Sequence, residues 1–301
     1  MLPFPSQDEI KDLIQLARRE DLGAAGDDVT SRLLIPENQV GVGTLLQKNV
    51  GIACGLPIVE QVCRAYDERL RVELIPGFHM EIIEGRFSDA RVTPLLRIRG
   101  PMRSLLSAER VVLNFLQRMS GVATLTNRYA KRVEGTKAKI YDTRKTIPGW
   151  RALDKYAVRR GGGFNHRVGL YDGLLVKDNH LSAVPLKELS AFLANIVARS
   201  RTEDPRRLVE VEVDTLDQFR ELLKLENGID VVLLDNMDCP RMQQAVEMRD
   251  RAGRKFEFEA SGGVTLETVR SIALTGVERI AVGAITHSAP ALDIGLDVES
   301  Q

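Results

Sequence analysis

The chain has 301 residues, 44% of them hydrophobic and 28% charged, so it can bury a sizeable core and is not expected to be disordered. Lys and Arg together number 42, as do Asp and Glu, which argues against a protein whose main task is to coat nucleic acid or a membrane surface. No apolar run approaches the roughly 18 residues of a transmembrane helix. From the charge balance and the lack of such a run, neither nucleic acid nor a membrane is an expected partner.

The first hundred or so residues read as a helix followed by short strands. Apolar residues at Ile10, Leu13, Ile14 and Ala17 have helical spacing and predict a helix over 7–20. A second helix is predicted at 57–66, and the predicted strands are 43–50, 69–75, 80–87 and 94–99. The connections between the last strands are too short to hold helices, which predicts an antiparallel sheet with helices, an α+β module.

The pattern changes after a long helical stretch over 104–133, in which Gly121 is a candidate interruption. Apolar runs then alternate with helical segments. The predicted strands are 138–141, 173–176, 208–213, 230–234, 256–260 and 279–282, and the predicted helices are 150–160, 186–201, 216–225, 240–252 and 266–275. Repeated β-then-α units indicate a parallel sheet, and periodicity alone fits an open doubly wound sheet as well as a barrel.

The three cysteines, Cys54, Cys63 and Cys239, are odd in number and lack the spacing of a metal site. Each stands among apolar neighbours, so we expect buried free thiols. The first residues have neither the basic start nor the apolar middle of a signal peptide. The expectation is a cytoplasmic protein that relies on neither disulfides nor a Cys-based zinc site.

Charged residues or glycines follow each of the six predicted parallel strands. They are Asp142 to Lys145, Lys177 to His180, Glu212 with Asp214, Asp235 with Asn236, Ser261 to Gly263, and Gly283 with Ala284. Parallel β/α proteins place their sites at the carboxyl ends of the strands. Ordinary polar loops would explain one or two such ends better than six. The sequence therefore predicts a functional site at this edge.

Two of these strand ends favour a phosphate. Ser261, Gly262 and Gly263 lie between a strand and a helix, where backbone N–H groups can approach an anion. Gly283-Ala284 repeats the arrangement one strand later, and the last two such loops of β/α barrels often form a phosphate site. A tight turn also needs glycine, so the first loop taken alone is a weak signal.

Basic and acidic residues gather around the same strand ends. Arg144 and Arg167 have the planar geometry that binds carboxylates, whereas Lys145 and Lys177 offer point charges suited to phosphates, and His166 is a further basic residue. Glu212 and Asp235 suit magnesium, ribose hydroxyls or a developing cation, and salt bridges to the same lysines are the structural alternative. Together the cluster indicates a substrate with several negative charges.

The segment 139–181, which contains DTRKTIPGWRALDKYAVRRGGGFNHRVGLYDGLLVKDNHL, closely resembles the quinolinate phosphoribosyltransferase family. Further matching segments are EDLG at 20–23, SAERVVLNFLQRMSGVAT at 107–124, VEVEVDTLDQF at 209–219, LLDNM at 233–237, EASGGV at 259–264, and AVGAITHSAPALDIGLD near the end. The resemblance spans nearly the whole chain in family order and is loose between Tyr66 and Arg91. The link at 225–228 is a little longer than the family's.

The resemblance implies an N-terminal α+β open-faced sandwich domain at 1–117 and an incomplete α/β (TIM-like) barrel at 118–288. A tail at 289–301 would pack back on the first domain. The implied reaction, in de novo NAD biosynthesis, converts quinolinate and phosphoribosyl pyrophosphate to nicotinate mononucleotide, pyrophosphate and carbon dioxide, with Mg2+. The implied assembly is a homodimer with shared active sites.

The resemblance also assigns roles to residues. Arg144, His166, Arg167 and Lys177 would surround the two quinolinate carboxylates, joined by Arg110 of the partner subunit. Lys145, Glu212 and Asp235 would be catalytic and would hold the phosphoribosyl pyrophosphate, with Glu212 and Asp235 also holding the metal ion. The other substrate-binding residues would be Thr143 and the phosphate cradle of Ser261, Gly262, Gly263, Val282, Gly283 and Ala284.

Three alternatives remain at this stage. A related phosphoribosyltransferase with another acceptor, such as the molybdenum-associated homologues, is the nearest, and the intact NHR and KDNH motifs argue against it. A phosphate-binding barrel lyase or decarboxylase would share the phosphate loops but would not need Lys145 for pyrophosphate. A non-enzymatic scaffold should have lost some residues of the cluster, and none is lost.

Overall fold

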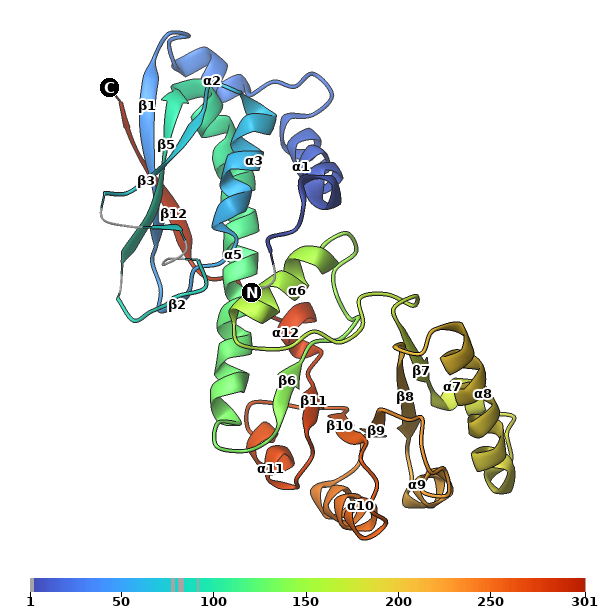
Figure 1. Cartoon of the computed structure of the whole chain (residues 1–301). Coiled ribbons are helices and arrows are strands. Elements are labelled where there is room, and N and C mark those ends of the chain that lie inside the picture. Colours follow the sequence, from blue (N-terminus) through green and yellow to red (C-terminus); the bar gives the residue numbers. More distant parts are fainter. Residues whose placement is uncertain (1–2, 77–78, 81–83, 91, 301) are drawn as a thin grey trace. The chain divides into compact units, whose positions relative to one another are not determined.

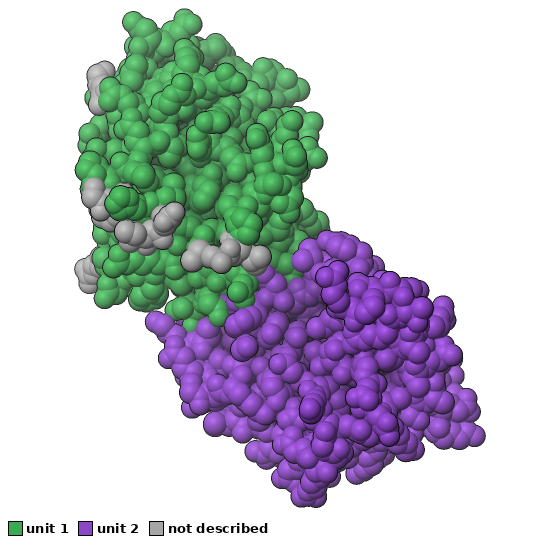
Figure 2. Space-filling model, viewed as in Figure 1, with its two compact units in different colours: residues 1–127, 146–162, 285–301 green, residues 128–145, 163–284 purple. Residues whose placement is uncertain are grey.

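The computed structural model describes residues 3–76, 79–80, 84–90 and 92–300 (Figure 1). Its residues form two compact units, one made of 1–127, 146–162 and 285–301, the other of 128–145 and 163–284 (Figure 2). The predicted domain boundaries at residues 117 and 288 stay a prediction. Among the described residues, no helix combines the length and the apolar character needed to cross a membrane.

The first unit contains an antiparallel four-stranded sheet in the order β12-β1-β5-β3. Its strands are β1 (Val40–Gln47), β3 (Arg71–Leu74), β5 (Thr93–Pro101) and β12 (Ile294–Ser300). Alternate residues of β1 are buried, as expected for a sheet with one face on a core. The C-terminal β12 pairs with β1 along its length, from Ser300 opposite Gly41 to Ile294 opposite Gln47. The predicted α+β module is confirmed.

Four helices of this unit begin and end near the predicted bounds: α1 (Gln7–Leu22), α3 (Leu56–Tyr66), α6 (Arg151–Arg160) and α5 (Met102–Arg132), of which the greater part belongs to this unit. The short helices α2 (Val29–Leu34) and α12 (Ala284–His287) were not predicted. The expected interruption at Gly121 is wrong, because α5 is continuous there. A side chain at Gly121 would place its Cβ 2.1 Å from the carbonyl oxygen of Pro290, so the glycine allows a close backbone approach.

One predicted strand of the first unit is not described in full. The strand predicted at 80–87 includes residues 81–83, which lie outside the described residues. The described part contains the short β4 (Phe87–Ser88), which pairs with β2 (Gly51–Ile52).

The second unit contains a parallel six-stranded sheet in the order β6-β11-β10-β9-β8-β7. Its strands are β6 (Lys139–Tyr141), β7 (Gly173–Val176), β8 (Leu208–Val213), β9 (Val231–Asp235), β10 (Glu257–Ser261) and β11 (Arg279–Ala281). The first strand pairs with the last, and the others follow in chain order. A doubly wound sheet would instead reverse direction from a central first strand. This cyclic order, with β6 and β7 at its two ends, defines an incomplete barrel and confirms the predicted fold class.

Helices connect successive strands of the barrel (Figure 1). They are α7 (Asp178–Leu181), α8 (Leu189–Glu203) after a 3-10 turn at Leu186–Glu188, α9 (Leu216–Leu222), α10 (Cys239–Arg251) and α11 (Val269–Leu274). Side chains set two of the starts: Thr215 accepts from the Gln218 amide, and Asp238 accepts from the Arg241 amide.

The helix between β6 and β7 belongs to the first unit instead. The buried Asp154 of α6 forms an ion pair of 2.8 Å with Arg118 of α5. Trp150, at the start of α6, stacks on Phe115 of α5 with ring centroids 4.8 Å apart. The sequence pattern places this helix among the β/α repeats, and these two contacts hold it in the first unit.

Candidate active site

A cavity of about 580 Å³ opens at the carboxyl ends of the barrel strands, within the second unit. Its lining contains eleven of the predicted site residues: Thr143, Arg144, Lys145, His166, Arg167, Lys177, Glu212, Asp235, Ser261, Gly262 and Gly263. Leu175, Leu233, Asn236, Glu259 and Ala281 complete it. Convergence of the strand ends follows from the parallel topology, since every strand points the same way.

Strand periodicity brings polar side chains into the barrel. Successive side chains of a strand face opposite sides, so Glu210 and Glu212 of β8 share one face while the three valines between and beside them share the other. Both glutamates are buried, with exposed fractions of 0% and 6%. On β10 the same alternation places Glu259 and Ser261 toward the cavity. The interior at this end is therefore polar.

Among the described residues, the guanidinium groups of Arg144 and Arg167 have no carboxylate within ion-pair distance. The Nε atom of each is buried and has no hydrogen-bond partner in this part of the chain. Arg167 donates from Nη1 to the carbonyl oxygen of Gly173, 3.0 Å away. Burial, and next the charge of Arg144, lower the pKa of Arg167. Two adjacent cations with unused donors form a binding site for an anion.

The lysines of the cavity have different surroundings. Lys177 Nζ lies 3.2 Å from Glu212 Oε2, and the ammonium is 45% exposed while the carboxylate is buried. The Lys145 amide donates to Thr143 Oγ1 over 3.0 Å, which shapes the turn after β6. Burial raises the pKa of Glu212, as does the charge of Asp235, while Lys177 lowers it, and the net direction is upward.

Three carboxylates form a group that could hold a metal ion. Oxygen atoms of Glu212, Asp214 and Asp235 lie within 4.8 Å of one another. Burial raises the pKa of Asp214, and the charges of Asp178 and Asp235 raise it further. Hard oxygen donors at this spacing suit Mg2+, so the residues fit the expected ion. Asp214 was not among the predicted ligands, although its i, i+2 spacing from Glu212 places both on one side of the strand end.

The glycine loop after β10 requires its glycines. Gly262 and Gly263 have φ values of +97° and +59°, a region that residues with a side chain rarely adopt. A Cβ at Gly262 would lie 2.1 Å from Asn236 Oδ1. Asn236 itself has a positive φ of 51°, and its amide donates to the carbonyl oxygen of Ser261. The two strand ends are thus locked together beside the cavity.

Four predicted site residues lie outside the cavity lining. Ala281 lines the cavity instead of Val282, Gly283 and Ala284, and the Val282 amide donates to the Tyr141 carbonyl oxygen over 2.9 Å. Arg110 lies on α5 in the first unit and is exposed. The substrate contacts assigned to these four residues stay predictions.

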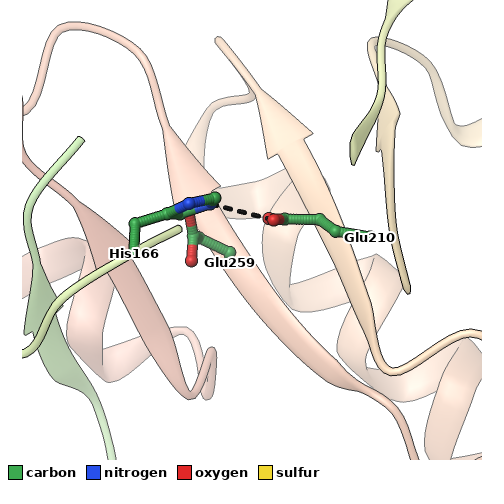
Figure 3. A group of neighbouring side chains, drawn as sticks. All are labelled: His166, Glu210 and Glu259. Atoms are coloured by element: carbon green, nitrogen blue, oxygen red, sulfur yellow. Dashed lines mark ion pairs between the residues drawn. The ribbon is translucent and has the colours of Figure 1, made fainter. Parts of the chain in front are cut away.

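A buried group beside the cavity was missed by the sequence reasoning. His166 Nε2 lies 2.9 Å from Glu210 and 3.4 Å from Glu259 (Figure 3), and Arg279 Nε lies 2.7 Å from Glu259. Burial opposes ionisation of His166, but the two carboxylates outweigh it and raise its pKa overall. The signal was the VEVEV pattern of β8, which places Glu210 on the same inner face as the predicted site residue Glu212.

Taken together, an incomplete parallel barrel with unpaired guanidinium groups, a carboxylate triad and a strained glycine loop defines an α/β-barrel enzyme for a small polyanionic substrate. The model of the quinolinate phosphoribosyl transferase C-terminal domain matches residues 122–297, and the model of the N-terminal domain of the same family matches 28–120. The chain belongs to the quinolinate phosphoribosyl transferase family.

Individual relatives resemble the chain over nearly its whole length. The nicotinate-nucleotide pyrophosphorylase [carboxylating] of Mycobacterium leprae is 40% identical, with 97% of this chain and 98% of the relative covered. Quinolinate phosphoribosyltransferase [decarboxylating] 1b of Nicotiana tabacum is 38% identical, with coverage of 97% and 83%. The solved nicotinate-nucleotide pyrophosphorylase of Francisella tularensis superposes with a TM-score of 0.85 at 33% identity, with 98% of each chain covered.

Proposed function

We propose that this enzyme transfers the phosphoribosyl group of phosphoribosyl pyrophosphate to quinolinate with decarboxylation, giving nicotinate mononucleotide, pyrophosphate and carbon dioxide. The observation that carries the proposal is the pairing, in one cavity, of two guanidinium groups without carboxylate partners and a group of three carboxylates. The first suits an acceptor with two carboxylates, and the second suits a metal-bound pyrophosphate donor. The names of the relatives support the same reaction.

The acceptor would bind at Arg144, Arg167 and Lys177. The two planar guanidinium groups can each take a carboxylate with two parallel hydrogen bonds, and Lys177 adds a point charge at the rim. His166 also lines the cavity. A monocarboxylate would leave part of this positive charge unpaired, at a cost of several kcal/mol, about the penalty for breaking a buried ion pair.

The donor would bind on the other side of the cavity. Lys145 would contact the pyrophosphate, and the loop of Ser261, Gly262 and Gly263 would bind a phosphate through backbone amides. Glu212, Asp214 and Asp235 would hold Mg2+. When bound, the ion would supply positive charge that neutralises the leaving pyrophosphate.

The residues of the chain then act mainly by position and charge. The bond between ribose C1′ and the pyrophosphate oxygen breaks with its electron pair leaving on the oxygen, and Glu212 and Asp235 stabilise the cation that develops on the ribose. The pyridine nitrogen, held in line by its carboxylates, forms the new bond to C1′. The pyridinium charge then stabilises the electron pair left on the ring carbon as carbon dioxide departs, and that carbon takes up a proton. No covalent nucleophile is required.

We further propose a homodimer in which Arg110 of the partner subunit completes each site, because the SAER segment that carries Arg110 resembles that of the family. Arg110 is exposed on α5, so its guanidinium is accessible to a second chain. We also propose a cytoplasmic location, since Cys54, Cys63 and Cys239 are free thiols, which a reducing compartment preserves.

Release of labelled carbon dioxide from carboxyl-labelled quinolinate tests the reaction. We expect release only when both phosphoribosyl pyrophosphate and Mg2+ are present, and nicotinate mononucleotide formed in equal amount. Nicotinate offered as acceptor should give at most about one hundredth of that turnover, because it lacks the second carboxylate. Release without the donor would indicate a decarboxylase, and equal use of nicotinate would indicate a different acceptor site.

A further inference from the structure

Two fully buried glutamates and a histidine meet beneath the acceptor side of the cavity. Glu210 comes from β8, Glu259 from β10, and His166 from the segment that precedes β7. Their side chains point toward one another, with the edge of the imidazole ring facing both carboxylates (Figure 3). Neither glutamate has any exposed surface. Burying two carboxylates side by side costs free energy, so the arrangement needs a reason beyond packing.

The contacts of His166 define which ring nitrogen carries a proton. The Arg167 amide donates to His166 Nδ1 over 2.7 Å, so Nδ1 is an acceptor and has no proton. Nε2, which faces Glu210 at 2.9 Å, therefore carries the ring proton. The raised pKa of His166 favours a doubly protonated ring, but such a ring would place two N–H donors against each other at Nδ1, so the geometry favours the singly protonated form. The backbone of His166 is also held in place, because its amide donates to Asp142 Oδ1 over 2.7 Å.

The charges of the group fit this assignment. Arg279 donates to Glu259 Oε2 over 2.7 Å and offsets one of the two carboxylates. Apart from their contacts with His166 Nε2, both oxygens of Glu210 and Oε1 of Glu259 are buried with no hydrogen-bond donor among the described residues. Burial, and next the charge of Glu210, raise the pKa of Glu259. The acceptor role of Nδ1 rests on its contact with the Arg167 amide.

The ring connects the buried carboxylates to an anion-binding residue. Its Nε2 side contacts Glu210 and Glu259, and its Nδ1 side holds the backbone of Arg167. The guanidinium of Arg167 is anchored separately, from Nη1 to the Gly173 carbonyl oxygen. The contact at the amide holds the backbone of Arg167, and the contact at Nη1 holds its guanidinium group. A planar bidentate contact with a carboxylate requires this fixed position.

We propose that Glu210 and Glu259 are positioning residues that orient His166 in its Nε2–H form and, through it, hold Arg167 in place for a carboxylate of the acceptor. The proposal rests on the proposed function for the identity of that acceptor. It assigns roles to two fully buried glutamates that would act through the histidine, as carboxylates do behind the histidines of metal sites. Loss of either glutamate should weaken acceptor binding and leave donor binding unchanged.

The protonation state is tested without any substrate. The chain has only four histidines, so ¹⁵N spectra of histidine-labelled wild-type protein are simple, and a His166→Gln variant assigns the signal of His166. We expect the shifts of an Nε2–H ring with an accepting Nδ1 near neutral pH. An Nδ1–H ring or a doubly protonated ring would overturn the proposal, whatever the enzyme turns out to bind.

Substitution of Glu210 tests the functional consequence. Glu210→Leu removes the acceptor, and we expect the quinolinate dissociation constant from calorimetry to rise about tenfold or more, which equals about 1.4 kcal/mol. The dissociation constant of phosphoribosyl pyrophosphate should stay within about twofold of the wild-type value. Glu210→Gln retains an oxygen that can accept from Nε2–H, so it should recover most of the quinolinate affinity.

Glu257→Gln is the matched control. Glu257 lies on the same strand as Glu259 and 3.8 Å from Arg279, but its side chain is 49% exposed. It should bind both substrates as wild type does. If Glu210→Leu binds quinolinate as wild type does, or loses both substrates equally, the two glutamates are merely structural. If the wild-type protein fails to use quinolinate, the proposed function is wrong. The ¹⁵N experiment uses no substrate, so its result does not depend on the proposed function.

Discussion

Arg144 and Arg167 lie at the same cavity with the Nε atom of each buried and unbonded, and the charge of Arg144 is second only to burial in lowering the pKa of Arg167. Two guanidinium groups in this relationship repel each other in a medium that screens charge poorly. Folding tolerates such a pair at a site where a bound anion offsets it. The pair is therefore the feature from which the substrate class follows most directly.

Arg167→Lys should damage the enzyme severely although the charge is kept. The ammonium offers no planar pair of donors and cannot reach both the Gly173 carbonyl oxygen and a carboxylate. We expect kcat/KM for quinolinate to fall about a hundredfold or more, or about 2.7 kcal/mol, in steady-state assays. Arg241→Lys, at an exposed arginine of α10, is the control. Wild-type kinetics in Arg167→Lys would make this arginine structural.

Asp235→Asn should separate the two substrates. Asp235 shares the carboxylate group with Glu212 and Asp214, so its loss weakens the proposed Mg2+ site. Calorimetry should find quinolinate affinity within about threefold of wild type, while turnover falls at every Mg2+ concentration tested. Asp217→Asn, on an exposed carboxylate of α9, controls for the change of charge. Loss of quinolinate binding in a folded Asp235→Asn protein would contradict the assignment.

Mixed subunits test the shared active site. Arg110→Ala and Lys177→Ala proteins should each be inactive. The first lacks the arginine proposed to complete the partner subunit's site, and the second lacks a lysine of its own subunit's cavity. A heterodimer would contain one intact site and one doubly damaged site. Random mixing makes half of the dimers heterodimers, so we expect recovery of about a quarter of wild-type activity. If both variants are inactive alone and heterodimers form without recovery, Arg110 acts in its own subunit's site.

Glu278→Gln should lower stability at neutral pH. Arg249 contacts this carboxylate at 2.9 Å, and Lys137 also bonds to it. Burial raises the pKa of Glu278, but these bonds and the Phe258 amide outweigh it, so the net direction is downward. We expect a loss of about 2 kcal/mol in the free energy of unfolding near pH 7, as for hydrogen bonds to charged groups.

The pH dependence of that loss has a definite sign. Because the folded-state pKa of Glu278 is depressed, its stabilisation is present above the unfolded value of about 4.3 and is lost as the pH falls through the folded value. Urea unfolding across this range should show the variant and the wild type converging in acid. Glu247→Gln, in an exposed pair with Arg251, is the control. A difference that does not shrink in acid would refute the ionic origin.

The local features were predictable because they depend on neighbours in the chain. Period-two and helical patterns placed the six barrel strands within one residue of their observed ends, and the polar strand ends identified eleven residues of the cavity lining. Parallel strands that all point one way must bring such ends together, so sequence position alone was enough to group Arg144, Glu212 and Asp235.

Only the tertiary structure decided which strands are neighbours and which helices cover them. Periodicity carries no information on strand order, so the pairing of β6 with β11, and with it the barrel, emerged only from the fold. The same holds for α6, which the contacts of Asp154 and Trp150 place in the first unit. Glu210 and Glu259 lie 49 residues apart in the sequence. Their shared contact with His166 exists because β8 and β10, which flank β9 in the sheet, turn the same face inward, a relation that no local pattern records.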